Sequence, residues 1–368
     1  MLLRLRPTAT EADLEVLRRV AGERGYEVRL LDARRIVAEL TRRDGRPAAG
    51  DRSAFEDLSF VAGVLDASDA PELAERTPGR EDSILRVGEA AFGGPFVSLI
   101  AGPCAVEDER RLLEIARAVK ASGATCLRGG AYKPRTSPYS FQGAGREGLE
   151  ALARVRAELE LPIVTEVLDP RDVASVAAVA DVLQIGARSM ANYALLAEVA
   201  RTQKVVLLKR GPAASVREFL LAAEHVLARG NARVLLCERG VRGFDQVTRN
   251  VLDVGAIAHL KRVTHLPVIV DPSHAAGRPE LVLPLARAGL AAGADGLMIE
   301  VHPQPNEARS DGAQAVSPAD FAEIARAAAA LARLDGRRLV VAREAPGERG
   351  KDREVRETPG RAGEGVRP

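Results

Sequence analysis

The segment LRGGAYKPRTSP (127–138) carries Arg128, Lys133 and Arg135 within eight residues of one another, and no acidic residue lies between them. Two glycines and two prolines in the same segment give the backbone the character of a shaped, stiff loop rather than of a core element. Phosphates and carboxylates are the natural partners of such cations, since a guanidinium group binds either of them through two hydrogen bonds. The segment therefore predicts an anion-binding loop.

Further cations follow other apolar segments of the chain. Together with the three cations of the loop, they form a set expected to face one cavity: Arg128, Lys133, Arg135, Arg188, Lys209 and Arg239. Six cations around one cavity would repel one another strongly at low dielectric, so they require anions. The anions are either a bound ligand or neighbouring acids such as Glu166, Glu238 and Asp271, and the residue types alone leave both alternatives open.

A second group of residues combines a thiol, an imidazole and two carboxylates, namely Cys104, His274, Glu300 and Asp311. Mixed sulfur, nitrogen and oxygen donors suit Mn, Fe, Co or Zn better than Ca or Mg. A structural zinc site would use a pair of closely spaced cysteines, which is missing here. The alternative is that Cys104 is only a packing residue, as single cysteines at strand ends usually are.

Both groups depend on a fold that brings distant strand ends together. Eight apolar segments, beginning near residues 96, 124, 161, 182, 204, 233, 266 and 296, alternate with helix-like segments such as 108–121, 146–159, 215–228 and 279–291. Continuous apolar strands alternating with helices indicate a parallel sheet covered by helices. Eight repeats predict an α/β fold of the (β/α)8 TIM-barrel type over 96–336, with a doubly wound open sheet as the alternative. Active sites of such barrels lie at the carboxyl ends of the strands, where both groups fall.

The regions outside the barrel have different patterns. Residues 1–70 show the order β-α-β-β-α-β of a small ferredoxin-like α+β domain, which we expect to serve regulation or assembly. Residues 71–95 read as a polar linker with room for a short hairpin. Residues 337–368 are charged and rich in glycine and proline, so we expect most of this tail to be disordered.

Composition narrows the class of protein. The 368 residues contain 53 Lys and Arg against 51 Asp and Glu, a net charge of +2, which argues against a general nucleic-acid or membrane surface. Three scattered cysteines do not form a disulfide framework and indicate a reducing compartment. The first residues do not form a signal peptide, and no apolar run reaches membrane-spanning length, so we expect a cytoplasmic protein.

Seven motifs together resemble one enzyme family. IAGPCAVE, LRGGAYKPRTSPYSFQG, QIGARS, LLKRG, LCERG, VDPSH and IEVHPQP…SDGAQ are similar in order and spacing to 3-deoxy-D-arabino-heptulosonate-7-phosphate (DAHP) synthase, over roughly residues 80–335. Within that family, the chain most resembles the microbial type I-beta branch, which has a short ferredoxin-like N-terminal domain. The resemblance implies condensation of phosphoenolpyruvate with erythrose 4-phosphate and water to give DAHP and phosphate, the first step of the shikimate pathway to aromatic amino acids.

The resemblance also implies roles for individual residues. Phosphoenolpyruvate would be held by Arg128, Lys133, Arg188, Lys209 and Arg239. Erythrose 4-phosphate would be held by Arg135 and Thr136. One divalent metal ion would be bound by Cys104, His274, Glu300 and Asp311. The candidates for proton transfer are Lys133, Glu166 and His302, which the sequence does not rank.

Other features of the resemblance leave alternatives. Ser189, Ala191, Pro212 and the segment GRP (277–279) depart from the family's usual residues and affect the expected contacts to the sugar phosphate. The related 3-deoxy-octulosonate-8-phosphate synthase, which uses arabinose 5-phosphate, is a second candidate, although KPRTSP differs from the corresponding loop of that relative. A third candidate is a non-catalytic regulatory subunit that pairs with another shikimate enzyme such as chorismate mutase.

The resemblance extends to assembly and regulation. It implies a homotetramer in which residues 1–70 bind tyrosine or phenylalanine between subunits. In the expected second strand of that domain, Arg29 could hold a carboxylate, whereas Leu31 offers no polar group for an amino acid.

Overall fold

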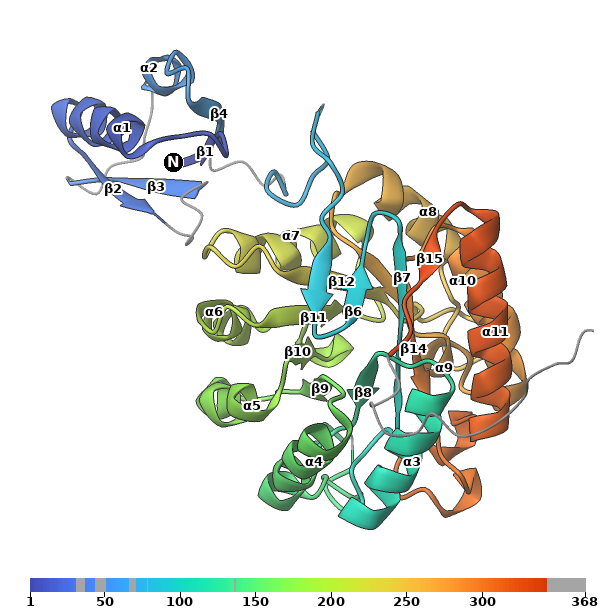
Figure 1. Ribbon diagram of the computed structural model, residues 1–368. Coiled ribbons are helices and arrows are strands. Elements are labelled where there is room, and N and C mark those ends of the chain that lie inside the picture. The colour runs from blue at the N-terminus through green and yellow to red at the C-terminus, as the bar shows by residue number, and fades with distance from the viewer. Residues whose placement is uncertain (31–36, 44–50, 66–70, 78, 136, 343–368) are drawn as a thin grey trace, which may run out of the picture.

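A computed structural model describes residues 1–30, 37–43, 51–65, 71–77, 79–135 and 137–342. Two units are visible in Figure 1, a small one near the N-terminus and a larger one in which helices surround a ring of strands. No helix among the described residues is long and apolar enough to cross a membrane.

The larger unit is a closed barrel. In the described part of the chain its eight strands are β7 (Phe96–Gly102), β8 (Cys126–Arg128), β9 (Ile163–Glu166), β10 (Val182–Ile185), β11 (Val205–Lys209), β12 (Val234–Glu238), β13 (Val268–Val270) and β14 (Gly296–Glu300). Each strand pairs in parallel with the next, and β14 pairs with β7 to close the ring. The predicted TIM barrel is confirmed, and the open sheet is excluded by the β14–β7 pairing.

Helices cover the outside of the barrel. They are α3 (Glu109–Ala121), α4 (Gly145–Leu159), α5 (Val173–Val179), α6 (Tyr193–Arg201), α7 (Val216–Leu227), α8 (Val254–Val263), α9 (Pro272–Ala276), α10 (Val282–Ala291) and α11 (Pro318–Leu334). Their apolar faces and the outward residues of the strands form one continuous core. This arrangement leaves the strand ends to the loops, where polar side chains can project without disturbing the core.

The small unit has the predicted element order. It consists of β1 (Leu2–Leu5), α1 (Glu11–Glu23), β2 (Tyr26–Leu30), β3 (Val37–Arg42), α2 (Arg52–Glu56) and β4 (Val61–Leu65). The sheet order β2-β3-β1-β4, with each pair antiparallel, is the ferredoxin-like arrangement. Thr10 and Asp13 form a capping box at the start of α1.

Residues 71–95 are packed onto the barrel instead of forming a free linker. The hairpin of β5 (Leu85–Val87) and β6 (Ala90–Phe92) places apolar side chains against residues inside the barrel, such as Ile100 and Met298. Glu224 on α7 accepts hydrogen bonds from the backbone of Leu73 at 2.7 Å and of Ala74 at 2.9 Å. The hairpin was foreseen, but the docking of the preceding segment depends on distant residues that local sequence patterns do not reveal.

The chain after α11 remains ordered for a few residues. The short strand β15 (Arg338–Leu339) pairs in parallel with the start of β7. Arg337 donates hydrogen bonds to the carbonyl oxygens of Leu290, Gly293 and Ala294. The beginning of the predicted tail is therefore part of the barrel unit, and residues 343–368 lie outside the described residues.

Candidate active site

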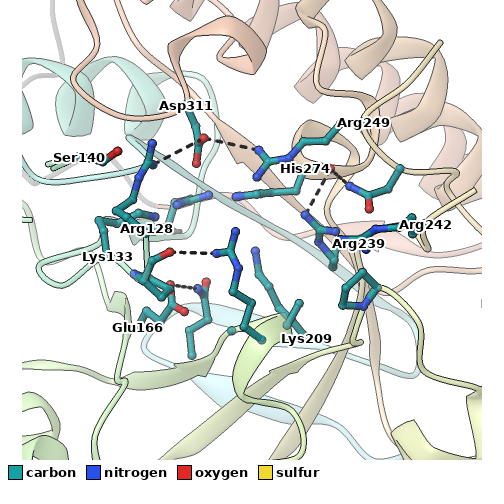
Figure 2. Close-up of a pocket in the computed structure, with 18 of the residues that line it drawn as sticks. Arg128, Lys133, Ser140, Glu166, Lys209, Arg239, Arg242, Arg249, His274 and Asp311 are labelled. Carbon is teal, nitrogen blue, oxygen red and sulfur yellow. Dashed lines mark hydrogen bonds and ion pairs between the residues drawn. The ribbon is translucent and has the colours of Figure 1, made fainter. Parts of the chain in front are cut away.

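A cavity of about 480 Å³ opens at the carboxyl ends of the barrel strands. Figure 2 shows that several cationic side chains, which come from strand ends and from the connections after them, face the cavity. The cations in its lining are Arg128, Lys133, Arg135, Arg188, Lys209, Arg239, Arg242 and Arg249. Against these, the lining includes two carboxylates, Glu166 and Asp311. All six cations that the sequence analysis grouped together are thus found at one cavity.

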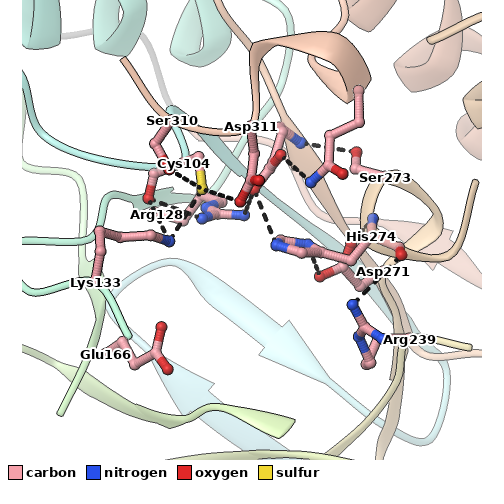
Figure 3. A network of polar contacts seen from close by, with 12 residues as sticks. Cys104, Arg128, Lys133, Glu166, Arg239, Asp271, Ser273, His274, Ser310 and Asp311 are labelled. Carbon is pink, nitrogen blue, oxygen red and sulfur yellow. Dashed lines mark hydrogen bonds and ion pairs between the residues drawn. The ribbon is translucent and has the colours of Figure 1, made fainter. Parts of the chain in front are cut away.

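The four predicted metal ligands also converge, beside this cavity. One potential ligand atom from each of Cys104, His274, Glu300 and Asp311 lies within 4.8 Å of the others. Cys104 Sγ is 3.2 Å from Asp311 Oδ2 (Figure 3), and His274 Nε2 is 3.2 Å from Glu300 Oε1. The cluster forms because β7, β13 and β14 are neighbours in the closed barrel.

Asp271 fixes His274 within the cluster. Asp271 caps α9 by accepting the backbone N–H of His274 at 3.0 Å, and its Oδ2 lies 2.7 Å from His274 Nδ1, although the ring is not well aligned for a hydrogen bond. Burial opposes the charge of Asp271, but His274 and Lys209 hold the pKa of this carboxyl well below its usual value. A carboxylate beside Nδ1 leaves Nε2 to face the other ligands, as in many metal-bound histidines.

Asp311 occupies an unusual backbone conformation. Its φ of 54° lies in the left-handed region, where a non-glycine residue is uncommon. Burial would raise the pKa of Asp311, but His274 and Arg249 lower it to about 2, so the side chain is anionic. Burial and the charge of Glu300 raise the pKa of the Cys104 thiol to about 12 in the absence of a metal ion.

Buried cations neutralise the acids of the cluster. Arg128 donates from one terminal nitrogen to Glu300 Oε1 at 2.9 Å and from the other to the carbonyl oxygen of Cys104 at 3.2 Å. Lys133 Nζ lies 3.0 Å from Cys104 Sγ, and Lys209 pairs with Asp271. Arg128 Nε is buried and has no hydrogen-bond partner among the described residues.

The other cations of the predicted set are less completely paired. Arg135 donates to Ser310 Oγ at 2.7 Å and lies 3.7 Å from Asp311. Arg188 donates to the carbonyl oxygen of Pro134 at 2.9 Å, and Arg239 donates to that of His274 at 3.4 Å. Neutral carbonyl oxygens do not cancel a positive charge, so the cavity is electropositive.

Besides the Lys209–Asp271 and Arg128–Glu300 pairs, a strand-end pair outside the cavity also fits the alternative of pairing within the protein. Glu238 accepts a hydrogen bond from Arg210 at 2.8 Å, and Arg210 also contacts Asp253 at 3.0 Å. These groups hold α8 to β11 and β12 and are missing from the cavity lining. Glu238 therefore serves Arg210 rather than the neighbouring Arg239.

The three candidates for proton transfer have different positions. Lys133 and Glu166 line the cavity, whereas His302 does not and lies in a separate small pocket near α3. Gln184 donates to Glu166 Oε2 at 3.2 Å. Gly186 permits this arrangement, since a Cβ at that position would lie 2.0 Å from Glu166 Oε1.

Two cations of the cavity lining, Arg242 and Arg249, were missed by the sequence analysis. Both lie on the long connection after β12, where the spacing follows no periodic element. The only sequence signal was their proximity to Arg239 in RGVRGFDQVTRN. Arg249 contacts Asp311 at 3.5 Å and Gln314 at 2.8 Å, whereas no partner is found for the Arg242 side chain among the described residues. Thr136 lies outside the described residues.

Comparisons with known proteins point in one direction. A family model described as the DAHP synthetase I family matches residues 86–334. The phospho-2-dehydro-3-deoxyheptonate aldolase of Thermotoga maritima is 40% identical over 324 residues, which are 88% of this chain and 95% of that relative. The crystal structure of the T. maritima enzyme, also titled DAHP synthase, superposes with a TM-score of 0.72 at 39% identity, over 92% of this chain and 98% of that chain.

Two further similarities complete this picture. A truncated form of the T. maritima 3-deoxy-D-arabino-heptulosonate 7-phosphate synthase superposes with a TM-score of 0.68 at 41% identity, over 73% of this chain and 98% of that chain. The 2-dehydro-3-deoxyphosphooctonate aldolase of Koribacter versatilis is 36% identical over 254 residues, which are 63% of this chain and 90% of that relative.

Proposed function

The chain belongs to the DAHP synthetase I family, and from this membership we propose how its cavity works. The protein condenses phosphoenolpyruvate with erythrose 4-phosphate and water to give DAHP and phosphate. The observation that carries the proposal is the electropositive cavity with the Cys104, His274, Glu300 and Asp311 group beside it. The two substrates together bring two phosphates and one carboxylate to this cavity.

Phosphoenolpyruvate fits the more deeply buried cations. Arg128, Lys133, Lys209 and Arg239 are buried. Arg188, which the family resemblance assigns to the same substrate, is exposed and lines the same cavity. A guanidinium group that lines the cavity, such as that of Arg128, is suited to a carboxylate or phosphate oxygen. Buried donors held in place before the substrate arrives also stabilise charge that develops during the reaction.

The phosphate of erythrose 4-phosphate fits the KPRTSP loop. Arg135 is partly exposed and lies beside Ser310 and Asp311. One erythrose 4-phosphate molecule could therefore place its phosphate at the loop and its aldehyde near the proposed metal ligands. Thr136 belongs to the same proposed subsite. Fixing both substrates in one cavity converts their encounter into an intramolecular event and so lowers the entropic barrier.

The four clustered residues fit a single divalent metal ion of the Mn, Fe, Co or Zn type. Their donor atoms are sulfur, nitrogen and oxygen, they lie within 4.8 Å of one another, and three carry or can acquire negative charge. Bound there, such an ion would supply Lewis-acid polarisation of the aldehyde oxygen. Asp271 orients the imidazole of His274, and Gln314 donates to Glu300 Oε2 at 2.5 Å, so two of the ligands are held by neighbouring polar groups.

The reaction joins the alkene carbon of phosphoenolpyruvate to the aldehyde carbon, adds water at the cationic centre that results, and releases phosphate by cleavage of its C–O bond. Of the three predicted candidates for proton transfer, Lys133 and Glu166 line the cavity. Lys133 has an ammonium N–H available beyond its contacts with Cys104, and Glu166 faces the cavity from β9. We therefore favour these two candidates over His302, which lines the separate pocket near α3.

The chain is also similar to 2-dehydro-3-deoxyphosphooctonate aldolases, at 34–36% identity over 62–68% of its length. The aldose that this protein uses is therefore the part of the proposal that most needs a test. The test measures phosphate release from phosphoenolpyruvate with erythrose 4-phosphate and, separately, with arabinose 5-phosphate. The proposal predicts a much larger kcat/KM for erythrose 4-phosphate. A preference for arabinose 5-phosphate would contradict it, and release with neither aldose would favour a non-catalytic subunit.

We also propose a role for the small unit, an oligomeric state, a cellular location and a partner protein. We propose a cytoplasmic homotetramer in which residues 1–70 bind tyrosine or phenylalanine, with a chorismate mutase as an additional partner. Against a carboxylate site at Arg29, this side chain pairs with Glu39 on the adjacent strand at 3.0 Å. Leu31 lies outside the described residues.

A further inference from the structure

The connection between β14 and α11 holds two of the proposed metal ligands. Glu300 ends β14, and Asp311 follows eleven positions later in a connection that contains two short 3-10 turns, η4 (Pro305–Glu307) and η5 (Gly312–Gln314). A bridge between Val301 and Val316 joins the two ends of this connection. Asp311 also has its backbone in the left-handed region. A non-glycine residue persists in that region only when its surroundings hold it there.

Two side chains, Glu107 just before α3 and Arg111 in its first turn, hold the middle of this connection. Glu107 Oε1 accepts the backbone N–H of Arg309 at 2.7 Å, two residues before Asp311. Arg111 donates to the side chain of Gln304 and, at 3.2 Å, to Glu307 Oε2. Glu107 itself follows Cys104 by three residues, so the contact links the segment of one metal ligand to that of another.

His302 lies between Glu107 and the backbone of Gln304. Its Nδ1 accepts the backbone N–H of Gln304 at 3.1 Å, which places the proton of the neutral ring on Nε2. This Nε2 is buried and faces Glu107 Oε1 across 3.8 Å, with no hydrogen-bond partner among the described residues. Leu112 and Ile115 of α3 line the same pocket, which is separate from the substrate cavity.

We propose that Glu107, supported by Arg111 and His302, is a positioning residue for the metal site. It fixes the backbone at Arg309 and so sets the two residues that follow, Ser310, which binds Arg135, and Asp311. The inference rests on the proposed metal-dependent function, and it gives His302 a structural task in place of proton transfer. Outer contacts of this kind typically change metal affinity by about 10- to 100-fold when removed.

The test compares Glu107→Ala and Glu107→Gln with a matched control, Glu109→Ala. Glu109 is an acid two positions further along, but it pairs with Arg154 on α4 at 2.8 Å and does not contact the β14–α11 connection. Titration with Co²⁺ alone, followed by the thiolate-to-metal absorption band of Cys104, measures metal affinity without relying on turnover. We expect about 10- to 100-fold weaker binding for Glu107→Ala. Glu107→Gln should lose less, because its amide oxygen still accepts the Arg309 N–H, and the control should match the unaltered chain.

A second readout separates this inference from the proposed function. Hydrogen exchange of the Arg309 and Gln304 amides, measured on metal-free protein of unchanged helical content, should accelerate in Glu107→Ala and not in Glu109→Ala. Unchanged Co²⁺ affinity in Glu107→Ala, or unchanged exchange at Arg309, would overturn the inference. Failure of the unaltered chain to show the Co²⁺–thiolate band would refute the proposed metal site instead, and the exchange rates would still decide whether Glu107 holds the connection.

Discussion

Lys133 is the residue at which the metal group and the substrate cavity meet. Its ammonium group contacts both the sulfur and the carbonyl oxygen of Cys104, at 3.0 and 3.2 Å, and its side chain also lines the cavity. Burial disfavours the charge of Lys133, yet Cys104 and Glu166 raise the pKa of its ammonium above the ordinary value. An ammonium group has three N–H donors, so one remains for a substrate oxygen after the two contacts with Cys104.

Loss of the Cys104 thiol should therefore weaken metal binding more than it weakens substrate binding. We predict that Cys104→Ser weakens binding of Zn²⁺ or Co²⁺ by more than about 100-fold, since a direct ligand contributes more than an outer contact. Cys126→Ala is the control, because Cys126 is buried inside the barrel among apolar residues. Equilibrium titration measures both. Equal affinity in Cys104→Ser and the unaltered chain would show that Cys104 is only a packing residue.

The two substrates should respond differently to two arginines. Arg188→Ala should raise KM for phosphoenolpyruvate by about 10- to 100-fold, as expected for a charge-assisted hydrogen bond of about 1.5–3 kcal/mol. Arg135→Ala should do the same for erythrose 4-phosphate. A smaller effect of Arg188→Ala on the aldose is expected too, because Arg188 holds the backbone of Pro134 next to Arg135. Steady-state kinetics with each substrate varied provides the measurement, and indistinguishable KM changes for both substrates in both variants would contradict the assignment.

At the scale of elements, the position of the Glu166 side chain depends on how closely the end of β9 approaches the turn after β10. Glu166 ends β9, and the backbone of Gly186 passes so close to its carboxylate that no side chain fits between them. We predict that Gly186→Ala shifts Glu166 by about 1 Å or more and lowers kcat by about 100-fold.

The matched control for this variant is Gly255→Ala in α8, where the nearest atom to an added Cβ is 3.6 Å away, an ordinary contact. Thermal unfolding of both variants should remain cooperative. Unchanged kcat in Gly186→Ala would exclude a role for the exact position of Glu166.

Much of the order of strands and helices could be predicted, because it depends on local sequence patterns. The eight apolar strands, the helices between them and the charged strand ends are all readable from short windows, and β-barrel closure then brings Cys104, His274 and Glu300 together. His302 follows Glu300 by only two residues, but the chain turns after the strand, so its side chain points toward α3. Arg242 and Arg249 lie on an aperiodic connection, whose path is decided by contacts such as those of Arg249 with Asp311 and Gln314.

At the scale of the whole molecule, residues 71–95 join the two units. The N–H groups of Leu73 and Ala74 are bound by Glu224, and the hairpin that follows fills the barrel end opposite the cavity. The barrel unit therefore begins near residue 71 rather than at residue 96, because removal of this segment would expose apolar side chains inside the barrel and take away the two backbone donors of Glu224.

A chain that starts at Pro71 should fold and retain condensation activity. If residues 1–70 bind an aromatic amino acid, tyrosine or phenylalanine should inhibit the full chain and not the truncated one. Turnover with and without each amino acid, together with sedimentation to determine oligomer size, measures this. Equal inhibition of both chains would contradict the regulatory role. No inhibition of either chain, with a smaller assembly after truncation, would leave the small unit a role in assembly.

The central claim is that the cation-lined cavity and the clustered donor group act as one metal-dependent site. The most direct measurement incubates the unaltered chain with ¹³C-labelled phosphoenolpyruvate and erythrose 4-phosphate before chelation, after chelation, and after addition of Mn²⁺, Co²⁺ or Zn²⁺. We predict a labelled seven-carbon product and stoichiometric phosphate, both lost on chelation and restored by metal. Undiminished product formation after complete metal removal, or no seven-carbon product under any condition, would contradict the account.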